Sequence, residues 1–114
     1  MIETIDSMQF EEKVIQNELP VFVEFKSDWS GPCHIVNSSL NELAVEFNGK
    51  FAFYALDYDQ NKLLVEEYRI QKLPTVLFFC KGEIIDHLIG PNPKNTVRTK
   101  IVDIVLKGEC KLGR

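Results

Sequence analysis

The sequence lacks the features that mark a membrane protein, a nucleic-acid-binding protein or a metal site. Its longest apolar run, Val76 to Cys80, is far too short to span a bilayer. Its basic residues are scattered and outnumbered, for a formal net charge of −4, so we expect neither nucleic acid nor an anionic membrane as a partner. His34 and His87 lie far apart without neighbouring ligands, so we expect no metal and no other cofactor.

Cysteines are also few, and their spacing is poor material for a disulfide framework. The three, Cys33, Cys80 and Cys110, suit a reducing compartment better. Cys80 ends a predicted strand near the surface, and Cys110 falls in a predicted frayed tail at residues 109–114. Either could be modified or cross-linked, but we interpret both as incidental thiols. Residues 1–4 show no basic or apolar part of a secretory signal, so we expect a cytoplasmic protein.

What is present is the composition of one soluble domain. The chain has 114 residues, of which 45% are hydrophobic and 26% charged. It contains no internal repeat, low-complexity stretch or linker. We therefore expect residues 1–114 to form a single domain, whose oligomeric state the sequence does not indicate.

The spacing of apolar residues predicts strand–helix units, then a hairpin and a last helix. Helices are predicted at residues 7–17, with Ser7 as N-cap, and at 31–47, 62–68 and 95–107. Strands are predicted at residues 21–25, 51–56, 75–79 and 84–89. Strands that are apolar on both sides need helices on both faces of their sheet. The predicted fold class is α/β, with a mixed central sheet flanked by helices on both faces.

The segment from Trp29 to Cys33 joins a predicted strand to a predicted long helix. Gly31 permits a sharp turn, and Pro32 fits the first helical turn because its missing N–H needs no partner there. Unpaired N–H groups at a helix N-terminus stabilise a thiolate. The position therefore favours an acidic cysteine.

This arrangement resembles the active site of the thioredoxin family, in which a strand leads into Trp-x-Gly-Pro-Cys and a helix. Further segments match in order and spacing: residues 57–61, residues 69–75, and the glycines Gly82 and Gly90. The match covers roughly residues 7–106. It implies a thioredoxin fold.

The resemblance also implies what the motif has lost. The family's first cysteine is exposed and attacks a substrate disulfide, and its second is buried and resolves the mixed disulfide. Here Ser30 replaces the first, and an alcohol cannot supply the thiolate. Cys33 matches the second, either as a reactive single thiol or as a buried packing residue. We interpret Ser30 as an N-cap that accepts the Cys33 N–H; a hydrolytic pair with His34 lacks an orienting group.

Glu24 is the one charged residue of its predicted strand, so we expect it to be partly buried with a raised pKa. The resemblance makes it the counterpart of an Asp that moves the second cysteine's proton, hence a possible proton acceptor for Cys33. The family's partner lysine aligns with Ala55, and Lys26 replaces an aromatic residue. A carboxylate that merely persists beside a water-filled gap is an equally supported interpretation.

The resemblance further implies a groove for extended polypeptide. The Leu73–Pro74 bond would be cis, the backbone beside it would pair with a bound segment like an added strand, and Trp29 would cover one side. The predicted binding residues are Trp29, Gly31, Pro32, Leu73, Pro74, Thr75 and Gly90.

Three hypotheses of function follow. The first is a thioredoxin-like protein of the thiol–disulfide oxidoreductase family that binds polypeptide segments, some of them cysteine-bearing, with weak or absent dithiol reductase activity. The second is a non-catalytic peptide-binding or protein-binding module on the same scaffold. The third is an engineered serine in an ordinary thioredoxin, but Glu24, Lys26 and Ala55 also depart from the family pattern, which favours natural divergence.

Overall fold

Five strands form one mixed sheet in the computed structural model, which describes residues 2–108 and 110. Their order across the sheet is β1-β3-β2-β4-β5. The parallel strands are β1 (Glu3–Ile5), β3 (Ala52–Asp57) and β2 (Val21–Lys26). The antiparallel strands are β4 (Thr75–Cys80), which pairs with β2, and β5 (Glu83–Ile89) at the edge.

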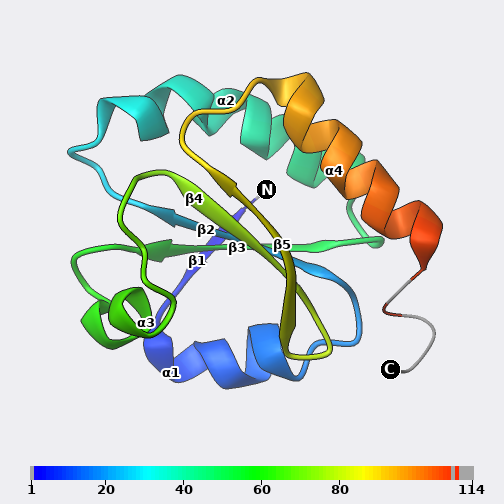
Figure 1. Ribbon diagram of the computed structural model, residues 1–114, viewed down its shortest axis with the longest axis horizontal. Coiled ribbons are helices and arrows are strands. Elements are labelled where there is room, and N and C mark those ends of the chain that lie inside the picture. Colours follow the sequence, from blue (N-terminus) through cyan, green and yellow to red (C-terminus); the bar gives the residue numbers. More distant parts are fainter. Residues whose placement is uncertain (1, 109, 111–114) are drawn as a thin grey trace.

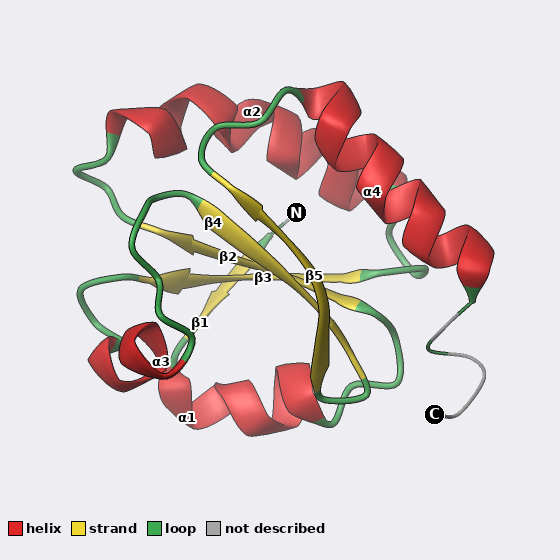
Figure 2. Cartoon of the chain, in the orientation of Figure 1, coloured by secondary structure: helices red, strands yellow, loops and turns green. Residues whose placement is uncertain are grey.

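Helices cover both faces of this sheet (Figures 1 and 2). One face carries α2 (Gly31–Glu46) and α4 (Lys94–Lys107). The other carries α1 (Ser7–Phe10), its π-helical continuation η1 (Glu11–Ile15), and α3 (Lys62–Glu67). The predicted α/β class and the mixed sheet are confirmed. Within the described residues, no helix has the length and apolar character needed to cross a bilayer.

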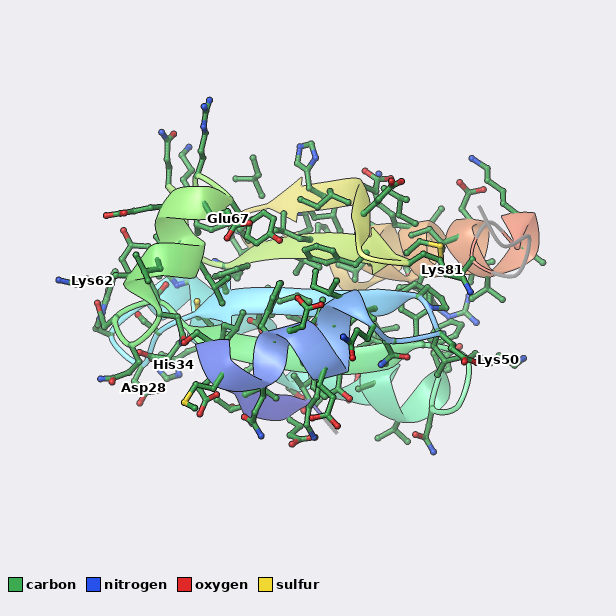
Figure 3. All side chains as sticks on the ribbon, turned by 90° about the horizontal axis from the view of Figure 1, so that it is seen from below. Asp28, His34, Lys50, Lys62, Glu67 and Lys81 are labelled. Atoms are coloured by element: carbon green, nitrogen blue, oxygen red, sulfur yellow. A yellow bond between two sulfur atoms is a disulfide. The ribbon has the colours of Figure 1, made fainter. Side chains whose placement is uncertain are left out.

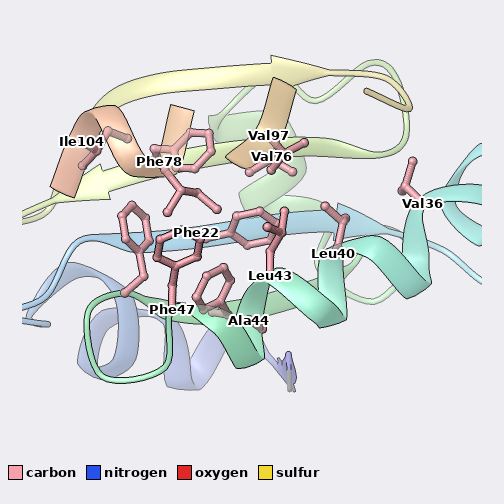
Figure 4. Close-up of a cluster of buried hydrophobic side chains, with 13 residues drawn as sticks. Phe22, Val36, Leu40, Leu43, Ala44, Phe47, Val76, Phe78, Val97 and Ile104 are labelled. Atoms are coloured by element: carbon pink, nitrogen blue, oxygen red, sulfur yellow. The ribbon is translucent and has the colours of Figure 1, made fainter. Parts of the chain in front are cut away.

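The strand period explains why the sheet has two cores. Along β2, Phe22 points to the α2 and α4 side, whereas Val23 and Phe25 point to the α1 and α3 side. Figure 4 shows the first cluster, in which Phe22 and Phe78 of the sheet meet the inner faces of both helices. Both rings are 0% exposed. Such burial on both sides fixes β2, and therefore the start of α2 that follows it.

The N-terminal region differs most from the predicted boundaries. The first helix is capped by Asp6, not by Ser7, because the Asp6 carboxylate accepts the Gln9 N–H while the Gln9 side chain accepts the Asp6 N–H. The helix ends two residues earlier than predicted, at Ile15. Strand β1 was not predicted: it has three residues, two of them polar and exposed, which is too short for a period-2 signal.

The interpretation of Cys80 and Cys110 as incidental thiols is wrong, and Cys80 is not near the surface. The two are 6% and 4% exposed and joined in a disulfide across 30 residues, with Cα atoms 5.4 Å apart. They meet because α4 packs along the sheet toward the end of β4, and Gly108 then ends the helix in a left-handed conformation (φ +62°). The remaining residues of the predicted frayed tail, 109 and 111–114, lie outside the described residues.

Candidate functional site

The motif lies where β2 gives way to α2. Ser30 is extended and caps the helix: its Oγ accepts the Cys33 N–H at 3.3 Å, which confirms the predicted N-cap. Pro32 occupies the first turn, where no hydrogen bond is lost. Cys33 begins the buried face of α2 and is only 4% exposed. The helix N-terminus thus presents one thiol, turned toward the interior.

Position 30 is not the exposed position that the resemblance implies. Ser30 is 5% exposed, because its hydroxyl turns inward to cap the helix. The His34 amide donates to the Ser30 carbonyl, and a nitrogen of the His34 ring lies 2.7 Å from the carbonyl oxygen of Asp28. The imidazole is therefore engaged with Asp28, away from the serine hydroxyl. Figure 3 shows both Asp28 and His34 at the same end of the molecule.

Glu24 lies in the middle of β2 and is 1% exposed. By strand alternation it shares with Phe22 the face that α2 covers, and its register neighbours are Ala55 on β3 and Val76 on β4. Burial raises its pKa to about 7, although the charge of Lys26 lowers it somewhat. Glu24 Oε2 has no hydrogen-bond partner within the described chain. The predicted burial and raised pKa are confirmed.

The cation beside this carboxylate comes from an unexpected position. Ala55, the register neighbour of Glu24 on β3, is completely buried and carries no charge. Lys26 instead follows Glu24 by two residues on the same strand, hence on the same side of the sheet, and is half-buried. Position 55 therefore places no charge next to Glu24, whereas Lys26 supplies one from the same strand.

A groove of about 440 Å³ opens beside the motif. Trp29 stands at its wall, 66% exposed, and its indole N–H donates to Asp59 Oδ2 at 2.7 Å. The Trp29 and Tyr58 rings pack nearly perpendicular to each other, with centroids 6.3 Å apart. These contacts hold a large aromatic side chain outside the core in a fixed orientation. The lining residues are Trp29, Ser30, Gly31, Pro32, Tyr58, Gln71 and Leu73.

The remaining predicted binding residues, Pro74, Thr75 and Gly90, do not line the groove but anchor the loop that carries Leu73. The Leu73–Pro74 peptide bond is cis, and the Pro74 ring is fully buried. Thr75 is buried, and its hydroxyl donates to the Lys72 carbonyl at 2.6 Å. The Gly90 amide donates to the Pro74 carbonyl at 2.8 Å. Leu73 is therefore presented at the groove by a loop whose neighbours are bonded into the sheet.

Sequence reasoning did not assign three residues of this site: Tyr58, Asp59 and Gln71. All three lie in the two segments, residues 57–61 and 69–75, that match the thioredoxin pattern. Their positions follow from the meeting of two loops with the motif, which no local pattern encodes. Among the described side chains, no three of His, Cys, Asp or Glu gather closely enough to hold a metal ion.

The strand order, the motif at the start of α2 and the cis bond before Pro74 together define a thioredoxin fold. The thioredoxin family model matches residues 1–103. Thioredoxin from Pyropia yezoensis is 33% identical over 100 residues, which cover 88% of this chain and 94% of that protein. The crystal structure of thioredoxin from Trypanosoma brucei brucei superposes with a TM-score of 0.84 at 26% identity, over 92% of this chain and 91% of that one. The chain therefore belongs to the thioredoxin family.

Relatives of greater length match as well. Chloroplastic M-type thioredoxin from Spinacia oleracea is 37% identical over 100 residues, or 88% of this chain. The corresponding protein from Pisum sativum is 38% identical over the same share. The matched part spans 55% and 58% of these two relatives.

Proposed function

We propose that this member of the thioredoxin oxidoreductase family binds extended polypeptide segments, some cysteine-bearing, and carries a single motif thiol with weak or absent dithiol reductase activity. The observation that carries the proposal is the Ser30 hydroxyl, which stands at the attacking position and accepts the Cys33 N–H. A serine hydroxyl is far less acidic than a thiol and forms no mixed disulfide. Reduction by the two-thiol cycle is therefore closed to this motif.

Binding of a polypeptide rests on the groove and on the backbone beside it. The N–H and C=O of Leu73 bond to no other backbone group within the described residues, and both are available to an added strand. Trp29, held by Asp59, provides an exposed aromatic wall for the side chains of such a strand. A cysteine in the bound segment would lie beside the start of α2, where Cys33 is located.

The role of Cys33 in this proposal is that of a slow single thiol assisted by Glu24. With a pKa of about 7, Glu24 exchanges its proton near neutral pH, as a proton acceptor requires. The burial of Cys33 limits its reaction to small reagents or to segments seated in the groove.

The same burial favours the second candidate function, a binding module in which Cys33 serves only as packing. A pH titration of Cys33 reactivity separates the two, in a chain with Cys80 and Cys110 replaced by Ala. Reaction in the folded protein, with a thiolate appearing below the ordinary cysteine pKa of about 8.5, supports chemistry. Reaction only after unfolding supports the packing role.

Peptide binding is tested with Trp29→Ala and with Leu106→Ala as its matched control, since Leu106 is also exposed (78%) but lies on α4. Trp29→Ala should weaken binding of an extended peptide library by about tenfold, since a central aromatic anchor contributes more than 1 kcal/mol. Isothermal titration measures both. Equal affinities for the two variants would remove the groove from the proposal.

A protein-disulfide reduction assay tests the predicted loss of turnover. The wild-type chain should fall at least about a hundredfold below an ordinary thioredoxin, because the first exchange step has no nucleophile. Turnover at ordinary rates that persists without Cys80 and Cys110 would contradict the proposal. A cytoplasmic location is also a proposal, and since several relatives are designated chloroplastic, cell fractionation should compare cytoplasm with plastid.

A further inference from the structure

The chain holds a pair of cysteine sulfur atoms that lies remote from the motif. Figure 3 shows the sulfur–sulfur bond beside Lys81, at the opposite end of the molecule from Asp28 and His34. This is the disulfide of Cys80, the last residue of β4, with Cys110, beyond α4. Because the motif contains one cysteine and the sequence three, this pair is the chain's intramolecular dithiol.

A cavity of about 220 Å³ reaches one of the two residues and not the other. Cys110 is part of its wall, together with Gly49 and Gly108, while Cys80 is not. A small thiol that enters this cavity therefore meets Cys110 before Cys80.

Among the described residues that line the cavity, one is acidic and one is basic. Glu18 and Lys50 both line it, and both are exposed. A small molecule in the cavity could place an ammonium group beside Glu18 and a carboxylate beside Lys50, and each would then face an opposite charge. The Lys50 charge also favours a thiolate near Cys110. These charges complement a zwitterionic thiol, the class to which glutathione belongs.

We propose that Cys80–Cys110 is a reversible redox site, opened and closed from the Cys110 side by a low-molecular-weight zwitterionic thiol and its disulfide. Opening requires little rearrangement of the core, because Cys110 lies past Gly108, where α4 has already ended. Cys80 stays fixed by the ladder between β4 and β5. Reduction therefore detaches Cys110 from the sheet while the two cores remain packed.

The exchange balances in two steps. The thiolate of one small molecule attacks Cys110 Sγ; the Cys80–Cys110 bond breaks, and its electron pair leaves with the Cys80 sulfur, which takes up a proton. A second small thiolate attacks the small molecule's sulfur in the mixed disulfide, releasing Cys110 as a thiolate and one small-molecule disulfide. Two thiols thus give two electrons to the protein disulfide, and the reverse sequence oxidises it.

The first experiment uses the full chain with Cys33→Ser, so that Cys80 and Cys110 are the two cysteines that remain. The protein is equilibrated in buffers of graded reduced and oxidised glutathione, quenched with a maleimide, and analysed by mass spectrometry. We expect the Cys80–Cys110 pair to be fully reduced in the most reducing buffer and fully oxidised in the most oxidising one, with the protein folded in both. The melting temperature of the oxidised form should be higher by about 10 °C, since the disulfide closes a long loop. Absence of the disulfide at every ratio, or its reduction only in denaturant, would overturn the proposal.

The second experiment tests the direction of attack. In the Cys33→Ser background, oxidised glutathione should modify Cys110 in a Cys80→Ser variant about tenfold faster than Cys80 in a Cys110→Ser variant, because access controls the rate. Equal or reversed rates would overturn the route. Should either variant fold poorly, peptide mapping of the mixed disulfide trapped on the intact pair answers the same question.

The third experiment tests the recognition of charge. Lys50→Gln should slow formation of the mixed disulfide several-fold, whereas Lys62→Gln, an exposed lysine on α3 at the motif end of the molecule (Figure 3), should not. Equal rates in the two variants would contradict recognition of a zwitterionic thiol by the charge of Lys50.

Discussion

The side chain at position 30 caps the helix as the motif requires but supplies no thiolate for attack on a disulfide. The Ser30 Oγ is bonded to the Cys33 N–H, in the first turn of a helix whose dipole favours a thiolate. Ser30→Cys should therefore close a reversible disulfide with Cys33. A redox titration followed by a reductase assay measures this in a chain lacking Cys80 and Cys110.

Full activity is not expected of the Ser30→Cys variant, because position 30 is buried and Lys26 and Ala55 remain unlike the family. Recovery of the disulfide with partial turnover is the expected result. If no 30–33 disulfide formed under oxidant, the backbone here would not be a thioredoxin active site, and the proposed function would fall with it.

The role proposed for Glu24 toward Cys33 acts through charge. Above its pKa of about 7 the carboxylate is ionised inside the protein and opposes a second negative charge nearby. Glu24→Gln should therefore shift the reactivity of Cys33 toward lower pH, as followed with a thiol reagent. Glu66→Gln, at an exposed position on α3, is the control. An unchanged profile in Glu24→Gln would place this carboxylate outside the site.

Among the secondary-structure elements, the first helix offers a test of which residue is its N-cap, Asp6 as observed or Ser7 as predicted. Asp6→Ala removes the reciprocal bonds with Gln9 and should lower the free energy of unfolding by about 1 kcal/mol. Ser7→Ala should change it by a few tenths at most, because Ser7 is already inside the helix. Urea denaturation measures both, and equal losses would restore Ser7 as the cap.

The elements that sequence reasoning predicted are those with a strong period. Strand β2 and helix α2 followed from apolar residues on both strand faces and from helical spacing between Val36 and Leu43. Strand β1 and the π-helical turn η1 did not, since three residues carry no period and a wider turn depends on packing.

The features of the site also fall into those that local sequence predicts and those that it does not. The cap at Ser30 and the burial of Glu24 are local consequences of a helix start and a two-sided strand, so the sequence sufficed. The bond from Trp29 to Asp59 and the pairing of Cys80 with Cys110 join segments about 30 residues apart, and only the folded chain brings them together.

For the molecule as a whole, the buried Glu24 makes stability depend on pH. Its folded pKa of about 7 lies above the unfolded value near 4.5, so between these values the folded state holds the extra proton. This contribution is complete below about pH 4.5 and is lost as pH rises through 7. Relative to Glu24→Gln, the wild type should lose roughly 3 kcal/mol between pH 4.5 and 8. Denaturant titrations across this range measure the difference, and a constant difference would contradict it.

The joining of Cys80 to Cys110 also decides how many thiols the native protein offers to a reagent. The oxidised chain has one free thiol, Cys33, and two electrons with two protons convert it into a chain with three. Thiol stoichiometry is therefore a direct readout of oxidation state. An unmutated, oxidised sample also isolates the motif cysteine: every equivalent of label that it takes up reports on Cys33 alone.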